Sequence, residues 1–95
     1  MATVKLDALN AAYDEGLVKG NLSERQRLYL NPSISTADMI LKALRTEQLS
    51  TEQLAARLNL HRNTLLIYLR WLEEKKLVMH YANGAANIYY REPIN

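Results

Sequence analysis

Four polar residues near the middle of the chain have side chains suited to reading a nucleic-acid duplex: Arg62, Asn63, Thr64 and Arg70. Arginine can donate two hydrogen bonds to guanine in the major groove, and asparagine pairs with adenine in the same bidentate way. Thr64 suits a phosphate or a base edge, and His61 suits a phosphate beside a helix start. These residue types therefore indicate base recognition, provided that their side chains share an exposed face.

Other chemistries find little support in the chain. His61 and His80 are the only histidines and lie nineteen positions apart, without a carboxylate at ligand spacing, and no cysteine is present. Glu73 and Glu74 are adjacent, so on a helix they point in different directions and do not form a catalytic pair. No glycine-rich phosphate loop or nucleophile elbow occurs. We therefore expect neither an enzyme nor a metal site, and no cofactor.

A helix over residues 62–76 would position these side chains. Leu65, Tyr68, Leu69 and Leu72 recur at intervals of three and four residues, which predicts one buried stripe. The residues between them then project away from the core: Arg62, Asn63, Leu66, Ile67 and Arg70. Leu66 and Ile67 have two interpretations. They contact thymine methyl groups, or they are covered by the N-terminal helices or a second subunit.

The residues before this helix predict a second helix and a tight turn. Ser50 followed by Gln53 has the form of a capping box that opens a helix, TEQLAARL, whose Leu54 and Leu58 face the core. Asn59 is one of the few residues other than glycine that accept a positive φ at low cost. The preceding QLS is short enough for a small edge strand.

Two alternating runs after the helix, LVMHY and NIYYR, predict a β-hairpin. Asn83-Gly84 is the turn signal, because glycine supplies the positive φ that such turns need. Only Asn83, Gly84 and Asn87 offer polar or flexible contacts at the tip, so the tip should bind DNA weakly. Tyr89 and Tyr90 should point to opposite faces, one of them toward the core.

The N-terminal part of the chain reads as helical. Leu6, Leu9 and Tyr13 share a helical face, and Gly16 or Gly20 should end that helix. Ser23 is placed to cap a short second helix, SERQRLYL, which ends before Asn31-Pro32, and NPSIS then forms a connector. A third helix, ADMILKALRT, should begin near Ser35. Its predicted inward residues are Met39, Ile40, Ala43 and Leu44.

Composition and charge are consistent with one small folded domain. The chain has 95 residues, 48% of them hydrophobic, and a net charge of +2. Charge is unevenly distributed, because residues 53–91 contain six basic and two acidic residues, and residues 53–72 contain no carboxylate. Phosphates could approach such a face. No apolar run approaches a membrane span, and the first ten residues lack the core of a signal peptide, so we expect a cytoplasmic protein.

The run LAARLNLHRNTLLIYLRWLEEKKLV, with the following hairpin, resembles prokaryotic winged helix-turn-helix transcriptional regulators over about residues 35–92. The resemblance implies a mainly α fold with a small β-hairpin wing, preceded by one or two N-terminal helices. Residues 1–34 would be an extension and residues 35–95 the DNA-binding domain. It also implies double-stranded DNA binding by a homodimer, with residues 62–76 as recognition helix. Arg57, His61 and the start of the helix at Thr51 would then hold phosphates.

Dimerisation is expected through the N-terminal helices, unless they fold onto their own domain. The candidate residues are Leu6, Leu9, Tyr13 and Leu17. We also expect Trp71 to be partly exposed, so that it could support the dimer contact. These features are consistent with two functions, one that reads DNA and one that binds another protein. The leading hypothesis is a sequence-specific DNA-binding transcriptional regulator. The alternative is a winged-helix module that binds another protein, or a DNA-maintenance protein that acts in partition or replication. Its protein partner is unknown. The apolar Leu66 and Ile67 and the uncharged wing favour this alternative.

Overall fold

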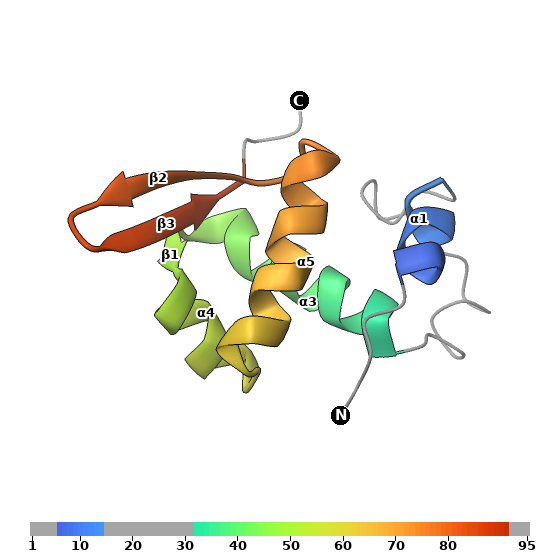
Figure 1. Ribbon diagram of the computed structural model, residues 1–95, viewed down its shortest axis with the longest axis horizontal. Helices are drawn as coiled ribbons and strands as arrows, with labels where there is room; N and C mark the ends of the chain where they lie inside the picture. The colour runs from blue at the N-terminus through green and yellow to red at the C-terminus, as the bar shows by residue number, and fades with distance from the viewer. Residues whose placement is uncertain (1–5, 15–31, 92–95) are drawn as a thin grey trace.

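The computed structural model describes residues 6–14 and 32–91. The predicted short helix from Ser23, together with Gly16, Leu17 and Gly20, lies outside the described residues. The elements are α1 (Leu6–Asp14), α3 (Pro32–Thr46), β1 (Leu49–Ser50), α4 (Thr51–Leu58), α5 (Arg62–Glu74), β2 (Met79–Asn83) and β3 (Ala86–Tyr90). Figure 1 shows the β2–β3 hairpin extending to one side of the helices and α1 on the other side. This arrangement confirms the predicted winged helix-turn-helix fold.

Helix α3 begins earlier than the sequence predicts. It starts at Pro32, so the expected connector NPSIS is largely its first turn. Proline favours the first helical position because its φ already fits a helix and the N–H that it lacks would have no partner there. The inward prediction for Met39 is wrong, since 43% of that residue is exposed. The buried stripe is instead Ala37, Ile40, Leu41 and Leu44.

The turn between α4 and α5 forms as predicted. The Ser50 hydroxyl accepts a hydrogen bond from the Gln53 N–H (3.1 Å), and Gln53 Oε1 accepts one from the Ser50 N–H (2.9 Å). At the other end of α4, Asn59 adopts φ 53°, and the Leu60 N–H donates to the Ala55 carbonyl at 2.9 Å. This left-handed residue closes the helix and redirects the chain into α5.

Helix α5 buries the predicted stripe and ends two residues earlier than expected. Leu65, Leu69 and Leu72 are fully buried and Tyr68 nearly so. The helix ends at Glu74, and Lys76 then takes φ 60° while the Leu77 N–H donates to the Leu72 carbonyl. That hydrogen bond belongs to a Schellman motif, in which glycine is the usual left-handed residue. Here a lysine takes this left-handed backbone conformation, which L residues rarely adopt.

The sheet is antiparallel with strand order β1-β3-β2. Asn83 pairs with Ala86, so the two-residue turn is Gly84-Ala85, one position later than the predicted Asn83-Gly84, and Gly84 has φ 66°. A glycine at the first turn position fits the right-handed twist of a hairpin. As predicted, the two adjacent tyrosines point to opposite faces: Tyr89 is buried, which raises its pKa, and Tyr90 is half-buried.

Helix α1 packs on its own chain. Leu9 and Ala12 belong to the core, and the Trp71 Nε1–H donates to Asn10 Oδ1 at 3.0 Å. The Tyr13 ring meets Trp71 edge to face, with centroids 6.3 Å apart. The expected partial exposure of Trp71 is therefore wrong, because only 4% of the residue remains exposed beneath α1. Of the three described dimerisation candidates, Leu9 is fully buried in the core of its own chain, Tyr13 is half-buried and Leu6 stays exposed.

Candidate nucleic-acid interface

One face of α5 carries the residues predicted to read bases. Arg62, Asn63 and Arg70 are exposed, and Thr64 is half-buried near the helix start. They lie on α5 opposite the fully buried leucines, so the core holds the helix while its outer face remains accessible. Arginine and asparagine side chains on such a face can pair with guanine and adenine edges in a major groove.

His61 begins α5 by capping it. Its Nδ1 accepts a hydrogen bond from the Asn63 N–H at 3.3 Å, and its φ and ψ are extended. Because Nδ1 is the acceptor, a neutral ring carries its proton on Nε2. The ring is exposed, so it can approach a phosphate through that second nitrogen.

Two of the arginines lie against carboxylates. Arg62 Nε is 3.5 Å from Glu52 Oε1, and Arg57 Nη1 contacts Glu47 Oε2. The hydrogen bond from Arg57 lowers the pKa of Glu47, and the same contact raises the pKa of Arg57. The carboxylate-free stretch 53–72 therefore acquires negative neighbours from outside it. Sequence reasoning missed these pairs, because each joins residues ten positions apart in different segments of the fold: Glu47 precedes β1, whereas Glu52 and Arg57 lie on α4 and Arg62 begins α5.

Thr51 does not present its side chain for a phosphate contact. Only 2% of the residue is exposed, because the first turn of α4 packs against the sheet. The capping box also engages the backbone N–H groups of Ser50 and Gln53. The phosphate contact predicted at the start of this helix therefore stays a prediction, and it would involve backbone groups and not the Thr51 side chain.

The apolar pair on α5 divides between the core and the surface. Leu66 is half-buried and packs against the core, whereas 44% of Ile67 is exposed. Asn10 and Tyr13 of α1 meet this side of the domain at Trp71 and Lys75, toward the end of α5 and away from Ile67. Ile67 thus stays beside Asn63 and Arg70 on the outer face and is available to a thymine methyl group or to a partner protein.

The wing is held against α5 at its base and is uncharged at its tip. His80 Nδ1 lies 2.7 Å from Glu73 Oε2, and the His80 ring lies over Tyr89 with centroids 5.1 Å apart. Asn83, Gly84 and Asn87 are exposed, and residues 79–90 contain no arginine or lysine. The tip therefore has only amide and backbone groups to offer a phosphate.

Two further observations concern the described part of the chain. Over residues 6–14 and 32–91, no three side chains of the metal-ligating types lie close enough together to hold an ion. Within the same ranges, every helix is too short or too polar to span a bilayer.

The fold is that of winged helix-turn-helix proteins, and two solved structures show the similarity. Reduced HlyU from Vibrio cholerae N16961 matches with a TM-score of 0.62 and 24% identity, over 93% of this chain and 81% of that one. NolR from Sinorhizobium fredii matches with a TM-score of 0.56 and 18% identity, over 98% of this chain and 83% of that one. No protein-family model and no curated protein sequence matches the chain.

Proposed function

We propose that this protein binds double-stranded DNA in a sequence-specific manner and regulates transcription, with α5 in the major groove. The observation that carries the proposal is the exposed face of α5, where Arg62, Asn63 and Arg70 stand opposite a fully buried leucine stripe. HlyU and NolR, which share the fold, are DNA-binding transcriptional regulators. The proposal includes no catalytic step.

Phosphate contacts around this face would come from Arg57 and from His61. Arg57 ends α4 and His61 begins α5, so the two side chains flank the recognition helix. Each residue would neutralise or hydrogen-bond a phosphate, which fixes the register of the helix without reading sequence. Asn83, Gly84 and Asn87 at the wing tip would add a weak backbone-type contact.

A homodimer is part of the proposal. One module with few basic contacts binds modestly, and two half-sites on successive helical turns raise both affinity and specificity. Leu6 is 45% exposed on α1, and it offers an apolar contact for a second copy. Sedimentation velocity over a range of protein concentrations measures this association directly, and a monomer at all concentrations contradicts it.

The decisive experiment first selects bound sequences from random duplex DNA and then tests the variant Arg62→Ala/Asn63→Ala on the selected site. Each bidentate base contact contributes about 1–3 kcal/mol of discrimination. We therefore expect the preference for selected over random duplex to fall by at least about tenfold. Circular dichroism should stay unchanged, because both side chains are exposed.

The matched control is Lys42→Ala, which removes a cation from the exposed surface of α3. It should leave the preference intact. Equal discrimination by the double variant and the unmodified protein would contradict the assignment of α5 as the reading helix.

A protein interaction module, including a DNA-maintenance protein that recruits a partner, is the second candidate function. The exposed Ile67 and the uncharged wing favour it. A salt titration separates a DNA-binding protein from a module that binds only protein, because a DNA reader loses affinity steeply as salt rises, with a slope set by the phosphates it neutralises. A DNA-maintenance protein would share that slope and bind a protein partner in addition. Absence of duplex binding even at low salt would favour the interaction module.

A further inference from the structure

The tip of the wing carries an asparagine that is followed directly by glycine. Asn83-Gly84 is the only such pair in the chain. Both residues are exposed, and Figure 1 shows the hairpin projecting away from the helices. Asparagine is chemically labile, because its side-chain amide can be lost. The tip therefore contains a group that can change its own covalent structure.

Deamidation of an asparagine begins when the peptide nitrogen of the next residue attacks the side-chain carbon Cγ. The new N–Cγ bond closes a cyclic imide, the Cγ–Nδ2 bond breaks, and ammonia leaves with the proton of the peptide N–H. Water then opens the imide at either carbonyl, which gives aspartate or isoaspartate. The net change exchanges an amide for a carboxyl group, without oxidation or reduction. Glycine favours the attack, because it has no Cβ beside the nitrogen.

Gly84 provides the space that ring closure needs. It is the first residue of the two-residue turn and has φ 66°. Apart from its chain neighbours, no atom of the described residues lies within 4 Å of the position that a Cβ would occupy. The strand ladder ends at the pair of Asn83 with Ala86, so the Gly84 nitrogen lies outside it. Rotation of this peptide group toward Cγ therefore meets little steric resistance at Gly84.

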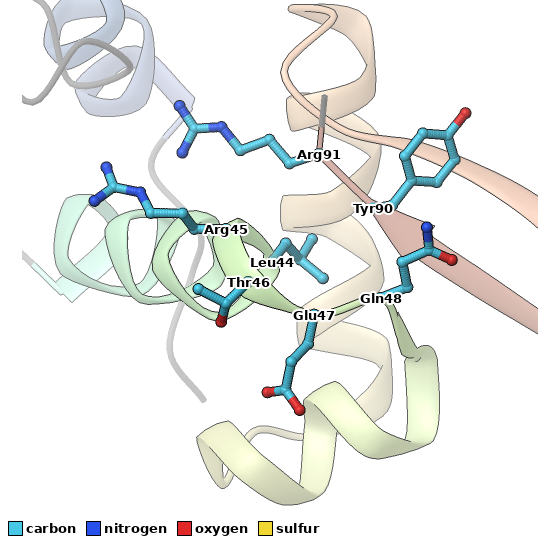
Figure 2. Close-up of a pocket in the computed structure, with 7 residues that line it drawn as sticks. All are labelled: Leu44, Arg45, Thr46, Glu47, Gln48, Tyr90 and Arg91. Carbon is cyan, nitrogen blue, oxygen red and sulfur yellow. The ribbon is translucent and has the colours of Figure 1, made fainter. Parts of the chain in front are cut away.

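The tip can open while the base of the wing stays in place. Strand β1 pairs with β3 at Ile88 and Tyr89, so the hairpin beyond Ile88 is two-stranded. The end of a two-stranded ladder opens at a small cost in free energy. The base is held by the Tyr81 hydroxyl, which donates to Gln48 Oε1 at 2.8 Å, and Figure 2 shows Gln48 and Tyr90 at the border of one pocket. Opening is thus confined to the residues around the turn.

The other asparagines in the described part of the chain lack this combination. Asn87 is exposed on the same hairpin, but it precedes Ile88, whose β-branched side chain crowds the peptide nitrogen. Ile88 also pairs with a strand on each side. The remaining described asparagines lie in a helix or at its end and do not precede glycine: Asn10, Asn59 and Asn63.

We propose that Asn83 is a site of spontaneous deamidation, which converts the uncharged tip of the wing into an acidic one. The product carboxyl group is ionised at neutral pH, and residues 79–90 contain no arginine or lysine to offset it. The consequence for DNA rests on the proposed function. A wing tip beside phosphates would lose affinity as the protein ages, because like charges repel. Isoaspartate would also lengthen the backbone within the turn.

The test is to incubate the full chain at physiological temperature and mildly alkaline pH and to follow deamidation by mass spectrometry. Trypsin cleaves after Lys76 and Arg91, so residues 77–91 form a single peptide that contains both Asn83 and Asn87. Fragment ions locate the mass gain of the exchange, which makes Asn87 an internal control. We expect conversion at Asn83 to exceed conversion at Asn87 by at least about tenfold.

Equal conversion of the two asparagines would overturn the proposal. A second comparison uses the free peptide 77–91, in which no tertiary structure restrains the turn. A rate at Asn83 in the folded protein within about a hundredfold of the rate in the peptide supports opening at the tip. A slower rate would show that the hairpin protects the dipeptide, and it would overturn the proposal as well.

The consequence for DNA is measured by fluorescence anisotropy with a labelled duplex, on fresh and on incubated protein. We expect incubation to weaken binding about two- to fivefold at low salt. The control is Asn83→Gln, whose longer side chain closes a ring less readily, so its affinity should be the same before and after incubation. Deamidation at Asn83 without any change in affinity would overturn the consequence for DNA.

The two measurements fail separately. The mass spectrometry contains no DNA, so a fresh protein that binds no duplex would contradict the proposed function of α5 without altering the deamidation result.

Discussion

At the scale of single residues, two of the arginines proposed to meet DNA, Arg57 and Arg62, are already in contact with carboxylates. Arg62 lies beside Glu52, and both side chains are more than half exposed, at 57% and 65%. Exposed ion pairs of this kind contribute little to stability, because water screens them. Their effect should instead appear in binding. A duplex must displace the carboxylate from Arg62, and Glu52 repels the approaching phosphates.

The substitution Glu52→Gln should therefore raise the affinity for duplex DNA by about two- to fivefold at low salt. Fluorescence anisotropy with a labelled random duplex measures the change. The matched control is Glu74→Gln, an exposed glutamate at the far end of α5. An equal increase in both variants would mean that only net charge matters and that the Glu52–Arg62 pair has no specific influence.

At the scale of elements, the end of α5 is strained where the wing begins. Lys76 holds φ 60°, and the hydrogen bonds from Lys76 and Leu77 back to α5 require that conformation. A left-handed L residue costs about 1–2 kcal/mol. This conformation directs the chain into β2 so that His80 lies beside Glu73.

Replacing Lys76 by glycine should stabilise the protein by up to about 1 kcal/mol, because glycine adopts this φ without a steric penalty. Urea denaturation followed by circular dichroism measures the free energy of unfolding. The neighbouring substitution Lys75→Gly is the control, since Lys75 has φ −83° and gains nothing from glycine. That variant should be destabilised, and a gain from Lys75→Gly as well would show that backbone strain at Lys76 is not the cause.

At the scale of the whole molecule, α1 joins the core of the winged helix domain. Leu9 is fully buried, and Trp71 connects α1 to α5 through Asn10 and Tyr13. Lys75 adds its ammonium group over the Tyr13 ring, 5.1 Å from the centroid. Helix α5 is thus supported on this side by α1 of the same chain.

Leu9→Ala should consequently destabilise the protein by about 2–5 kcal/mol, the usual cost of truncating a fully buried leucine. Thermal or urea unfolding measures it. Leu6→Ala on the same helix is the control, because Leu6 is 45% exposed and its loss should change stability by no more than about 0.5 kcal/mol. An unchanged stability in Leu9→Ala would contradict the docking of α1.

The sequence by itself determined the features that depend on neighbouring residues. The Ser50 capping box, the left-handed Asn59 and the leucine stripe of α5 could all be predicted, because each rests on hydrogen bonds or side-chain spacing within a few positions. The wing followed from alternation around a glycine. These local signals were enough for the winged helix-turn-helix fold and for the outer face of α5.

Only the tertiary structure decided which distant residues meet. It packed α1 onto Trp71, sixty-one positions from Asn10, and it brought Glu52 to Arg62. Periodicity assigns a side chain to one face of its own element and does not identify the neighbour across that face. The charge balance around α5 depends on that neighbour, so it became visible only once the elements had packed together.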